Sequence, residues 1–214
     1  MKKNLIHISG AFVLCAALVA TSTLAADKSA AADSKAGKTS SGAPPDEQEM
    51  MKKWEAAASP GPAHKALEPL VGEWELVTRF WMAGPDGPVT ETKGTAKAHW
   101  VLGNRFVHEQ VDGEMMGRPF QGMGVTGYDN LKKKYVGAWI DNAGTAIFTS
   151  EGTFDADGKV FTFTGKLDDP MTGEKDKTVK YIVRLISPEK RVFEMHDPSL
   201  GQKSKTGEIT YTKK

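Results

Sequence analysis

The fold is decided by residues 118–141, which read RPFQGMGVTGYDNLKKKYVGAWID. Two stretches of alternating side chains, 118–128 and 133–141, flank a short polar turn at Asp129-Asn130-Leu131. Successive side chains of a β-strand point to opposite faces, and a short polar connection joins antiparallel neighbours. The segment therefore predicts two adjacent antiparallel strands.

The same pattern extends in both directions, from Glu73 to Thr212, with Gly, Pro, Asn or Asp interrupting it every 8 to 15 residues. About ten antiparallel strands must bury one face without leaving long open edges, and closure into a barrel achieves this. A sandwich of two stacked sheets is the alternative. The predicted strands are 73–82, 89–101, 104–112, 118–128, 133–141, 145–154, 159–167, 177–187, 190–197 and 205–212.

The two faces of these strands differ in how clearly they separate. On 159–167, Phe161 and Phe163 alternate with threonines, so the aromatic face is predicted to be buried. On 118–128 and 133–141 both faces carry apolar residues, which suits a packed core on one side and a helix, partner or ligand cavity on the other. Gly122 and Gly124 mark either barrel corners or space beside a cavity.

Residues 1–26 have the features of a signal peptide. Lys2 and Lys3 precede an apolar run over residues 8–20, and small residues at 21–26 offer a cleavage site. We expect export to the periplasm or the exterior of a bacterial cell. An uncleaved anchor is the alternative, although a membrane span needs roughly 20 apolar residues.

Three further segments follow the leader. Residues 27–45, rich in Ala, Ser and Lys, are predicted to be a disordered linker because they lack large apolar side chains. Residues 46–70 are predicted to hold two short helices, at 46–58 and 64–70, that cover the open end or the side of the barrel. An interaction helix for a partner is the alternative. Residues 71–214 form the predicted barrel domain.

Charge and cysteine content exclude several function classes. The chain has 28 basic and 27 acidic residues; the leader carries two lysines and no acid, which leaves 26 and 27. A near-neutral protein lacks the basic face that nucleic acid requires, and no membrane association is expected after cleavage. The only cysteine, Cys15, lies in the leader, so disulfides, thiolate nucleophiles and zinc–thiolate sites are excluded from the mature protein.

Three blocks of sequence together resemble a known family. They are ALEPLVGEWE at 66–75, LGNRFV at 102–107, and GVTGYDN at 124–130 followed by YVGAWID at 135–141. They resemble the bacterial domain of unknown function 1579, over roughly residues 62–211. The resemblance implies a calycin-like β-barrel, often exported, and no established activity. Gly72-Glu73-Trp74 is also similar to the opening of lipocalin-like barrels, which implies that Trp74 closes the barrel base.

Motifs for catalysis, phosphate binding and metal binding fail in their context. The stretch at 122–127 fits G-x-G-x-x-G, but it lies within a strand with no helix after it. Ser150 lacks the strand–helix elbow of a serine nucleophile. No two histidines have metal-binding spacing, so no metal, cofactor or catalytic residue is predicted. Haem binding through His196 remains an alternative.

The leading hypothesis is a barrel that binds a small, largely apolar ligand, with Arg105 fixing a polar end. Arg105 is predicted to counter an interior acid such as Asp141 or Glu151, either as an ion pair that ties strands together or as a polar anchor for a ligand. Asp141 and Glu151 are also a candidate polar pair, which could support a hydrolase. A partner-binding module without a cavity is a further alternative. The predicted aromatic lining consists of Trp100, Phe120, Tyr128, Trp139, Phe148 and Phe163.

Overall fold

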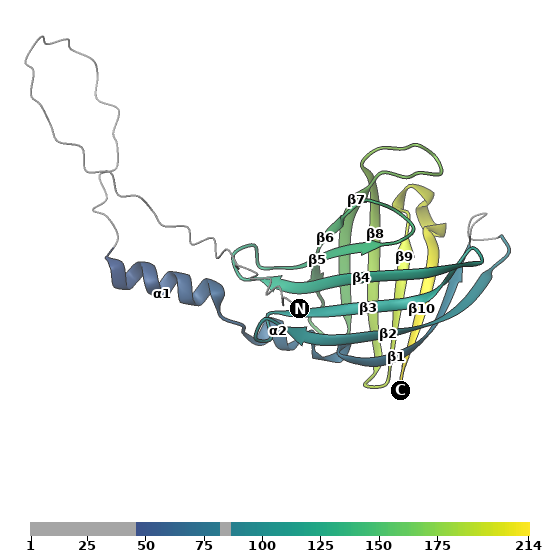
Figure 1. Cartoon of the computed structure of the whole chain (residues 1–214). Helices are drawn as coiled ribbons and strands as arrows, with labels where there is room; N and C mark the ends of the chain where they lie inside the picture. Colours follow the sequence, from purple (N-terminus) through teal and green to yellow (C-terminus); the bar gives the residue numbers. More distant parts are fainter. Residues whose placement is uncertain (1–45, 82–86) are drawn as a thin grey trace, which may run out of the picture. The chain divides into compact units, whose positions relative to one another are not determined.

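The computed structural model describes residues 46–81 and 87–214, and these form a β-barrel with short helices (Figure 1). The signal peptide expected at 1–26 and the linker expected at 27–45 lie outside the described residues, as does Met82 at the end of the first predicted strand. No helix among the described residues is long and apolar enough to cross a membrane.

Ten strands make up the barrel, as the sequence pattern predicts. They are Gly72–Phe80 (β1), Thr90–Val101 (β2), Phe106–Met115 (β3), Arg118–Asp129 (β4), Lys134–Asp141 (β5), Phe148–Phe154 (β6), Val160–Leu167 (β7), Lys177–Ser187 (β8), Lys190–His196 (β9) and Lys205–Lys213 (β10).

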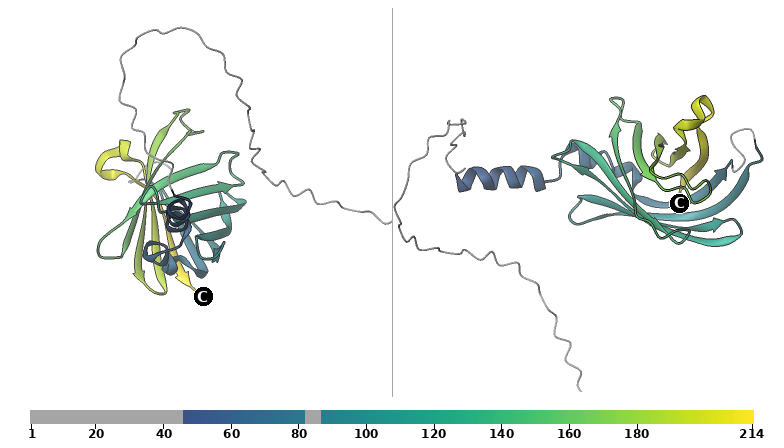
Figure 2. Two further views of the ribbon diagram at one scale, coloured as in Figure 1. Left: turned by 90° about the vertical axis from the view of Figure 1, so that its left-hand side faces the viewer. Right: turned by 90° about the horizontal axis from the view of Figure 1, so that it is seen from above.

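Each strand pairs antiparallel with its neighbours in sequence, and the barrel closes where β1 meets β10. Trp74 lies opposite Lys213 and Phe80 opposite Gly207 in this closing pair. Both views in Figure 2 show the sheet curling around a common interior. Because every strand is paired on both sides, no long edge is left unpaired. The predicted closed barrel is therefore confirmed, and the two-sheet sandwich is wrong.

Side-chain alternation assigns the two faces of the wall. On β7, Phe161 is fully buried and Phe163 nearly so, whereas Thr164 is exposed.

The β3–β4 connection shows how local sequence fixes the pairing register of two neighbouring strands. Met116 and Gly117 both have positive φ, at 53° and 73°, which two-residue hairpin turns require and glycine tolerates best.

Helix α1 spans Glu47–Ala58 and begins at Asp46, whose carboxylate accepts a hydrogen bond from the Gln48 amide. Its apolar residues Met50, Met51 and Trp54 are all exposed. The last carbonyls of the helix bind side chains from the barrel. Asn130 Nδ2 donates to the carbonyls of Ala57 and Ser59, at 3.0 and 2.9 Å. These bonds satisfy carbonyls that a helix terminus leaves unpaired.

Two short helices cap one end of the barrel. The predicted helix over 64–70 is divided into α2, Pro62–Lys65, and a 3-10 turn, η1, Glu68–Leu70. Pro69 explains the division, because proline lacks an N–H and clashes with the carbonyl four residues earlier. Leu67 is fully buried and Leu70 is 7% exposed, both within the core cluster that contains Phe161. The helices therefore close this end of the barrel.

Hydrogen bonds fix the cap to the barrel wall. Tyr135 donates its hydroxyl to the Ala63 carbonyl at 3.0 Å, and Trp100 Nε1 donates to the Glu68 carboxylate at 2.7 Å. Trp74 Nε1 donates to the Leu70 carbonyl at 3.2 Å, and the Trp74 side chain is 1% exposed. Trp74 thus lies in the buried base of the barrel beneath the cap. At the opposite end, a second 3-10 turn, Pro198–Lys203 (η2), joins β9 to β10.

Candidate functional site

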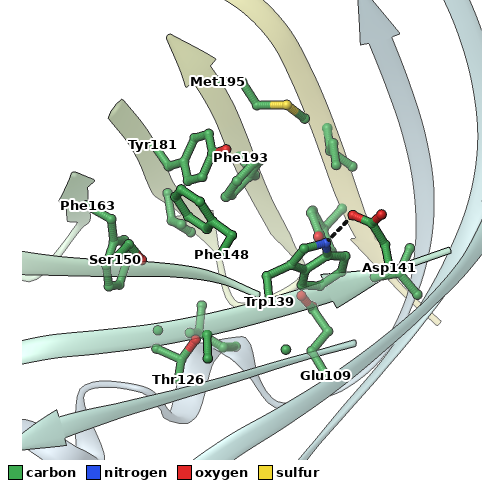
Figure 3. A pocket seen from close by; sticks show the side chains of 18 of the residues that line it. Glu109, Thr126, Trp139, Asp141, Phe148, Ser150, Phe163, Tyr181, Phe193 and Met195 are labelled. Atoms are coloured by element: carbon green, nitrogen blue, oxygen red, sulfur yellow. Dashed lines mark hydrogen bonds between the residues drawn. The ribbon is translucent and has the colours of Figure 1, made fainter. Parts of the chain in front are cut away.

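A cavity of about 410 Å³ occupies the barrel interior (Figure 3). Leu70 of the cap contributes to one end of it. Glu114 and Ala143 line the other end and are themselves exposed, so the cavity reaches the surface there. Its wall is mainly aromatic and aliphatic, and includes Phe80, Val107, Val111, Phe120, Trp139, Phe148, Phe163, Tyr181, Val183, Phe193, Met195, Ile209 and Tyr211.

Trp139 of β5 has the largest side chain among the residues that line the cavity, and its indole ring packs against two glycines of β4. A Cβ built on Gly122 would lie 2.3 Å from the indole ring, and one built on Gly124 would lie 2.7 Å from it. Both glycines are therefore required for the indole to lie against the strand. Gly124 also lines the cavity, as one of the two interpretations of the sequence expected, but the space beside both glycines is occupied by the indole.

Asp141 follows two residues after Trp139 on the same inward face. Trp139 Nε1 donates to Asp141 Oδ2 at 2.8 Å, and the Ala143 amide donates to Oδ1 at 3.0 Å (Figure 3). Within residues 46–81 and 87–214, Asp141 forms no ion pair with Lys, Arg or His. The cavity therefore carries a half-buried carboxylate whose charge has no basic partner in this part of the chain.

Three aromatic rings from β6, β8 and β9 form a cluster that begins at Phe148, the direct partner of Trp139 in the β5–β6 pair. Tyr181 lies 5.2 Å from Phe148 and 5.2 Å from Phe193 between ring centroids (Figure 3). Burial, and then the negative charge of Asp141, raise the pKa of Tyr181 to about 12. The phenol is thus neutral at physiological pH, and the cluster presents an apolar surface.

A buried ion pair lies deeper, near the capped end. Arg191 Nη2 donates to Glu109 Oε1, and the Arg191 side chain is 6% exposed. The guanidinium carbon lies 4.0 Å from the Tyr211 ring centroid and 4.9 Å from that of Trp74. Burial, and then the charge of Glu109, raise the pKa of Tyr211. Arg191 Nε is buried and has no hydrogen-bond partner within residues 46–81 and 87–214.

Five of the nine residues predicted for the site line the cavity, and four do not. Phe120, Trp139, Phe148, Phe163 and Asp141 lie along it. Trp100 and Tyr128 instead pack against the core cluster at the capped end. Both have the expected inward direction, but they occupy strand positions beside the cap, where the helices fill the interior.

Arg105 and Glu151 require correction, because both lie outside the cavity. Arg105 Nε donates to the Ala58 carbonyl at 3.0 Å, so the guanidinium holds the end of α1 and binds no interior acid. Glu151 lies on the outer surface between Lys132 and Lys134, with the latter at 2.9 Å. Those lysines lower the pKa of Glu151 to about 2. The expected pairing of Asp141 with Glu151 therefore does not form, and the two carboxyls proposed for a hydrolase lie apart.

His196 also lies outside the cavity, which removes the geometric basis for haem binding there. Its Nδ1 is 3.0 Å from Ser204 Oγ, and its Nε2 is 3.3 Å from Glu194 Oε2. Both ring nitrogens thus have protein partners. Among the described residues, no group of three or more His, Cys, Asp or Glu side chains is arranged to hold a metal ion.

Sequence reasoning missed the part of the site formed by β8, β9 and β10. Tyr181, Phe193 and Tyr211 line the cavity from these strands, together with the pair Arg191 and Glu109. A signal for Tyr181 was present, since Val179, Tyr181, Val183 and Leu185 alternate along 177–187. On 190–197 the inward positions are Arg191, Phe193 and Met195. The charge of Arg191 interrupts the apolar alternation, so the sequence does not indicate which face of this strand is inward.

The fold and its cavity define the class of the protein as a calycin-like closed β-barrel. Among solved structures, the chain is similar to the crystal structure of Rv2717c from M. tuberculosis, at 15% identity and a TM-score of 0.53. That match covers 73% of this chain and 99% of Rv2717c. A redesigned beta barrel matches over 73% of this chain and 99% of its own, at 14% identity and a TM-score of 0.36. No curated protein matches the chain.

The family model for proteins of unknown function DUF1579 matches residues 59–213. The chain therefore belongs to this family, which confirms the resemblance drawn from the three sequence blocks.

Proposed function

We propose that this protein binds a small, largely apolar molecule inside the barrel. The observation that carries the proposal is the cavity of about 410 Å³, which is open at one end and lined mainly by aromatic and aliphatic side chains. Ligand sites in proteins are typically concave, roughly 300–1,000 Å³ in volume, and apolar with a few placed polar groups.

The polar groups of the cavity are few and unevenly distributed. Glu109 and Arg191 neutralise each other near the capped end, whereas Asp141 lies nearer the open end. A ligand would therefore contact apolar wall over most of its surface. The hydrophobic effect favours such burial by about 25 cal/mol per Å² of apolar surface removed from water. The cavity supports binding more directly than catalysis, because Glu109 is paired with Arg191, and Glu151, the predicted partner of Asp141, is paired with lysines outside the cavity.

Occupancy of the cavity can be tested with one filled variant and one matched control. Ser150 lines the cavity on β6, while its neighbour Thr149 is exposed on the outer face. Ser150→Leu adds apolar volume inside, and Thr149→Leu adds the same kind of volume outside. We expect a fluorescent apolar probe to bind the wild type and Thr149→Leu, and to bind Ser150→Leu much more weakly.

Circular dichroism establishes that both variants are folded, and native mass spectrometry of gently purified protein reveals a retained molecule directly. Equal probe binding by Ser150→Leu and Thr149→Leu would place the probe outside the barrel and contradict the proposal. Absence of binding to the wild type would contradict it as well.

A further inference from the structure

We propose that the cavity selects an apolar molecule that carries a positively charged amine or ammonium group, and that this group binds over the indole of Trp139, beside the carboxylate of Asp141. The inference rests on the proposed function and deepens it by naming the chemical class of the ligand. Charge, geometry and the surrounding aromatic wall each support it.

The charges that line the cavity are mainly negative. Among the described residues that line it, Glu109, Glu114 and Asp141 contribute three carboxylates, and Arg191 contributes the only cation. Arg191 is already paired with Glu109. In the part of the chain that the structure describes, neither Glu114 nor Asp141 forms an ion pair. A cationic ligand would gain attraction here, and an anionic one would be repelled.

Asp141 and Trp139 are placed to bind one cation together. The hydrogen bond from Trp139 Nε1 to Asp141 Oδ2, at 2.8 Å, holds the carboxylate at the edge of the indole. A cation is attracted to an indole when it lies over the ring within about 6 Å of the centroid. From that position it would also be close to Asp141. The carboxylate has about four acceptor sites, and protein donors use two of them.

The two glycines determine which face of the indole is available. Gly122 and Gly124 lie in close contact with one side of the ring, as the short distances from their built Cβ positions show. The ring is therefore held flat against β4, and Trp139 lines the cavity. This arrangement presents an aromatic face, whose negative quadrupole attracts cations, to the interior.

The remainder of the ligand would lie against the aromatic cluster of Phe148, Tyr181 and Phe193. Phe148 lies directly opposite Trp139 on the neighbouring strand β6, and its ring packs against Tyr181. A hydrocarbon attached to a cation over the indole would therefore contact this cluster (Figure 3). The charge of Asp141 already acts in this space, since it contributes to the raised pKa of Tyr181. An ammonium group would neutralise that charge.

Arg191 offers the competing possibility of an anionic ligand, and its surroundings argue against it. The guanidinium is paired with Glu109 and packed against the rings of Tyr211 and Trp74. Its unpartnered Nε is buried from water, so a ligand in the cavity would have to displace protein atoms to reach it. Binding of an anion would also leave Glu109 without its partner, close to a second negative charge.

Three probes with the same hydrocarbon chain separate the ligand classes. We would titrate the protein at low salt with dodecyltrimethylammonium, dodecanol and dodecanoate and measure affinity by calorimetry. The two ionic probes are kept below their critical micelle concentrations, and dodecanol is kept below its solubility limit. We expect the cation to bind about tenfold more tightly than dodecanoate, from combined charge and cation–π attraction. Added salt should weaken binding of the cation and leave dodecanol nearly unchanged.

Asp141→Asn tests the assignment of the site, because the amide keeps a hydrogen-bond acceptor and removes the charge. Asp112→Asn is the matched control, since Asp112 is exposed and lies outside the cavity lining. We expect Asp141→Asn to lower affinity for the cation about tenfold and to change affinity for dodecanol less than twofold. Asp112→Asn should behave as the wild type.

The outcomes distinguish this inference from the function on which it rests. Failure of all three probes to bind the wild type overturns the binding function itself, and the inference with it. Binding of dodecanol together with equal or tighter binding of dodecanoate overturns only the preference for a cation. A preference for the cation that persists unchanged in Asp141→Asn overturns the assignment to Asp141. If Asp141→Asn does not fold, the effect of salt on cation binding by the wild type is the test. Cation binding that does not weaken with added salt overturns the inference.

Discussion

At the scale of single residues, the glycines beneath Trp139 tolerate little change. A methyl group at Gly122 would lie 2.3 Å from the indole, well inside van der Waals contact, and the ring is rigid. We therefore expect Gly122→Ala to displace Trp139 and to lower the free energy of unfolding by about 1–3 kcal/mol, the usual effect of overpacking. Urea unfolding and the near-ultraviolet dichroism of the tryptophans measure both effects.

Gly144 provides the control for that substitution. A Cβ at Gly144 would have no neighbour within 4 Å, and its backbone does not have positive φ. Gly144→Ala should therefore leave stability nearly unchanged. Equal losses in the two alanine variants would show that the close approach of Trp139 is not what requires glycine at 122.

The second residue-scale prediction concerns the ion pair near the capped end. Glu109→Ala removes the partner of Arg191, whose side chain is only 6% exposed. An uncompensated buried charge destabilises a protein by roughly 3–5 kcal/mol. Glu151→Ala removes an acid from exposed lysine pairs, which typically contribute about 1 kcal/mol or less. Chemical denaturation of both variants compares the losses, and similar values would contradict the buried role of Glu109.

At the scale of elements, a network of charges joins the β7–β8 loop to η2. Lys177 Nζ lies 2.9 Å from Asp169 and 2.9 Å from Asp197, with Glu174 at 3.9 Å. The bond from Lys177, followed by that from the Met171 amide, lowers the pKa of Asp169 to about 2. Burial would raise the pKa of Asp197, but bonds from Ser199 and Lys177 outweigh it and lower the pKa.

These shifts give stability a pH dependence with a defined sign. A carboxyl whose folded pKa is depressed stabilises the fold above its unfolded pKa of about 3.9, and the contribution is lost as pH falls through the folded value. We expect the urea midpoint of the wild type to fall between about pH 4 and pH 2 more steeply than that of Asp169→Asn. Asp157→Asn, in an exposed turn, is the control. Parallel profiles for Asp169→Asn and the wild type would contradict the network.

The elements also show how far the sequence allows prediction. Strand faces could be predicted where polar and apolar residues alternate strictly, as around Phe161 and Phe163. Period-two alternation gives the face of a residue but not its depth along the barrel, so Tyr128 was assigned to the cavity although it lies beside the cap. Arg105 was misassigned because its partner, the Ala58 carbonyl, lies 47 residues earlier in the chain. Glu109 and Arg191 are 82 residues apart, and no local pattern links them.

At the scale of the whole molecule, closure by β10 determines whether the sheet has edges. A chain ending at Ser204 would leave β1 and β9 each with an unpaired side. Exposed edges favour pairing between molecules, so we expect this truncated protein to aggregate. Size-exclusion chromatography measures the aggregation, and addition of a peptide spanning residues 205–214 should reduce it by restoring the missing strand. A monomeric, folded truncated protein would show that closure is dispensable.

The same closure brings the first and last parts of the barrel sequence together. Trp74 pairs with Lys213, and the Lys214 amide donates to the Glu73 carbonyl at 3.0 Å, on the side of the barrel where the cap lies. A linker joining the carboxyl terminus to the segment before α2, with new termini in the exposed connection at residues 144–146, gives a circular permutant that retains every strand pairing. The barrel thus depends on which strands are neighbours in space, and the chain can begin at more than one of them.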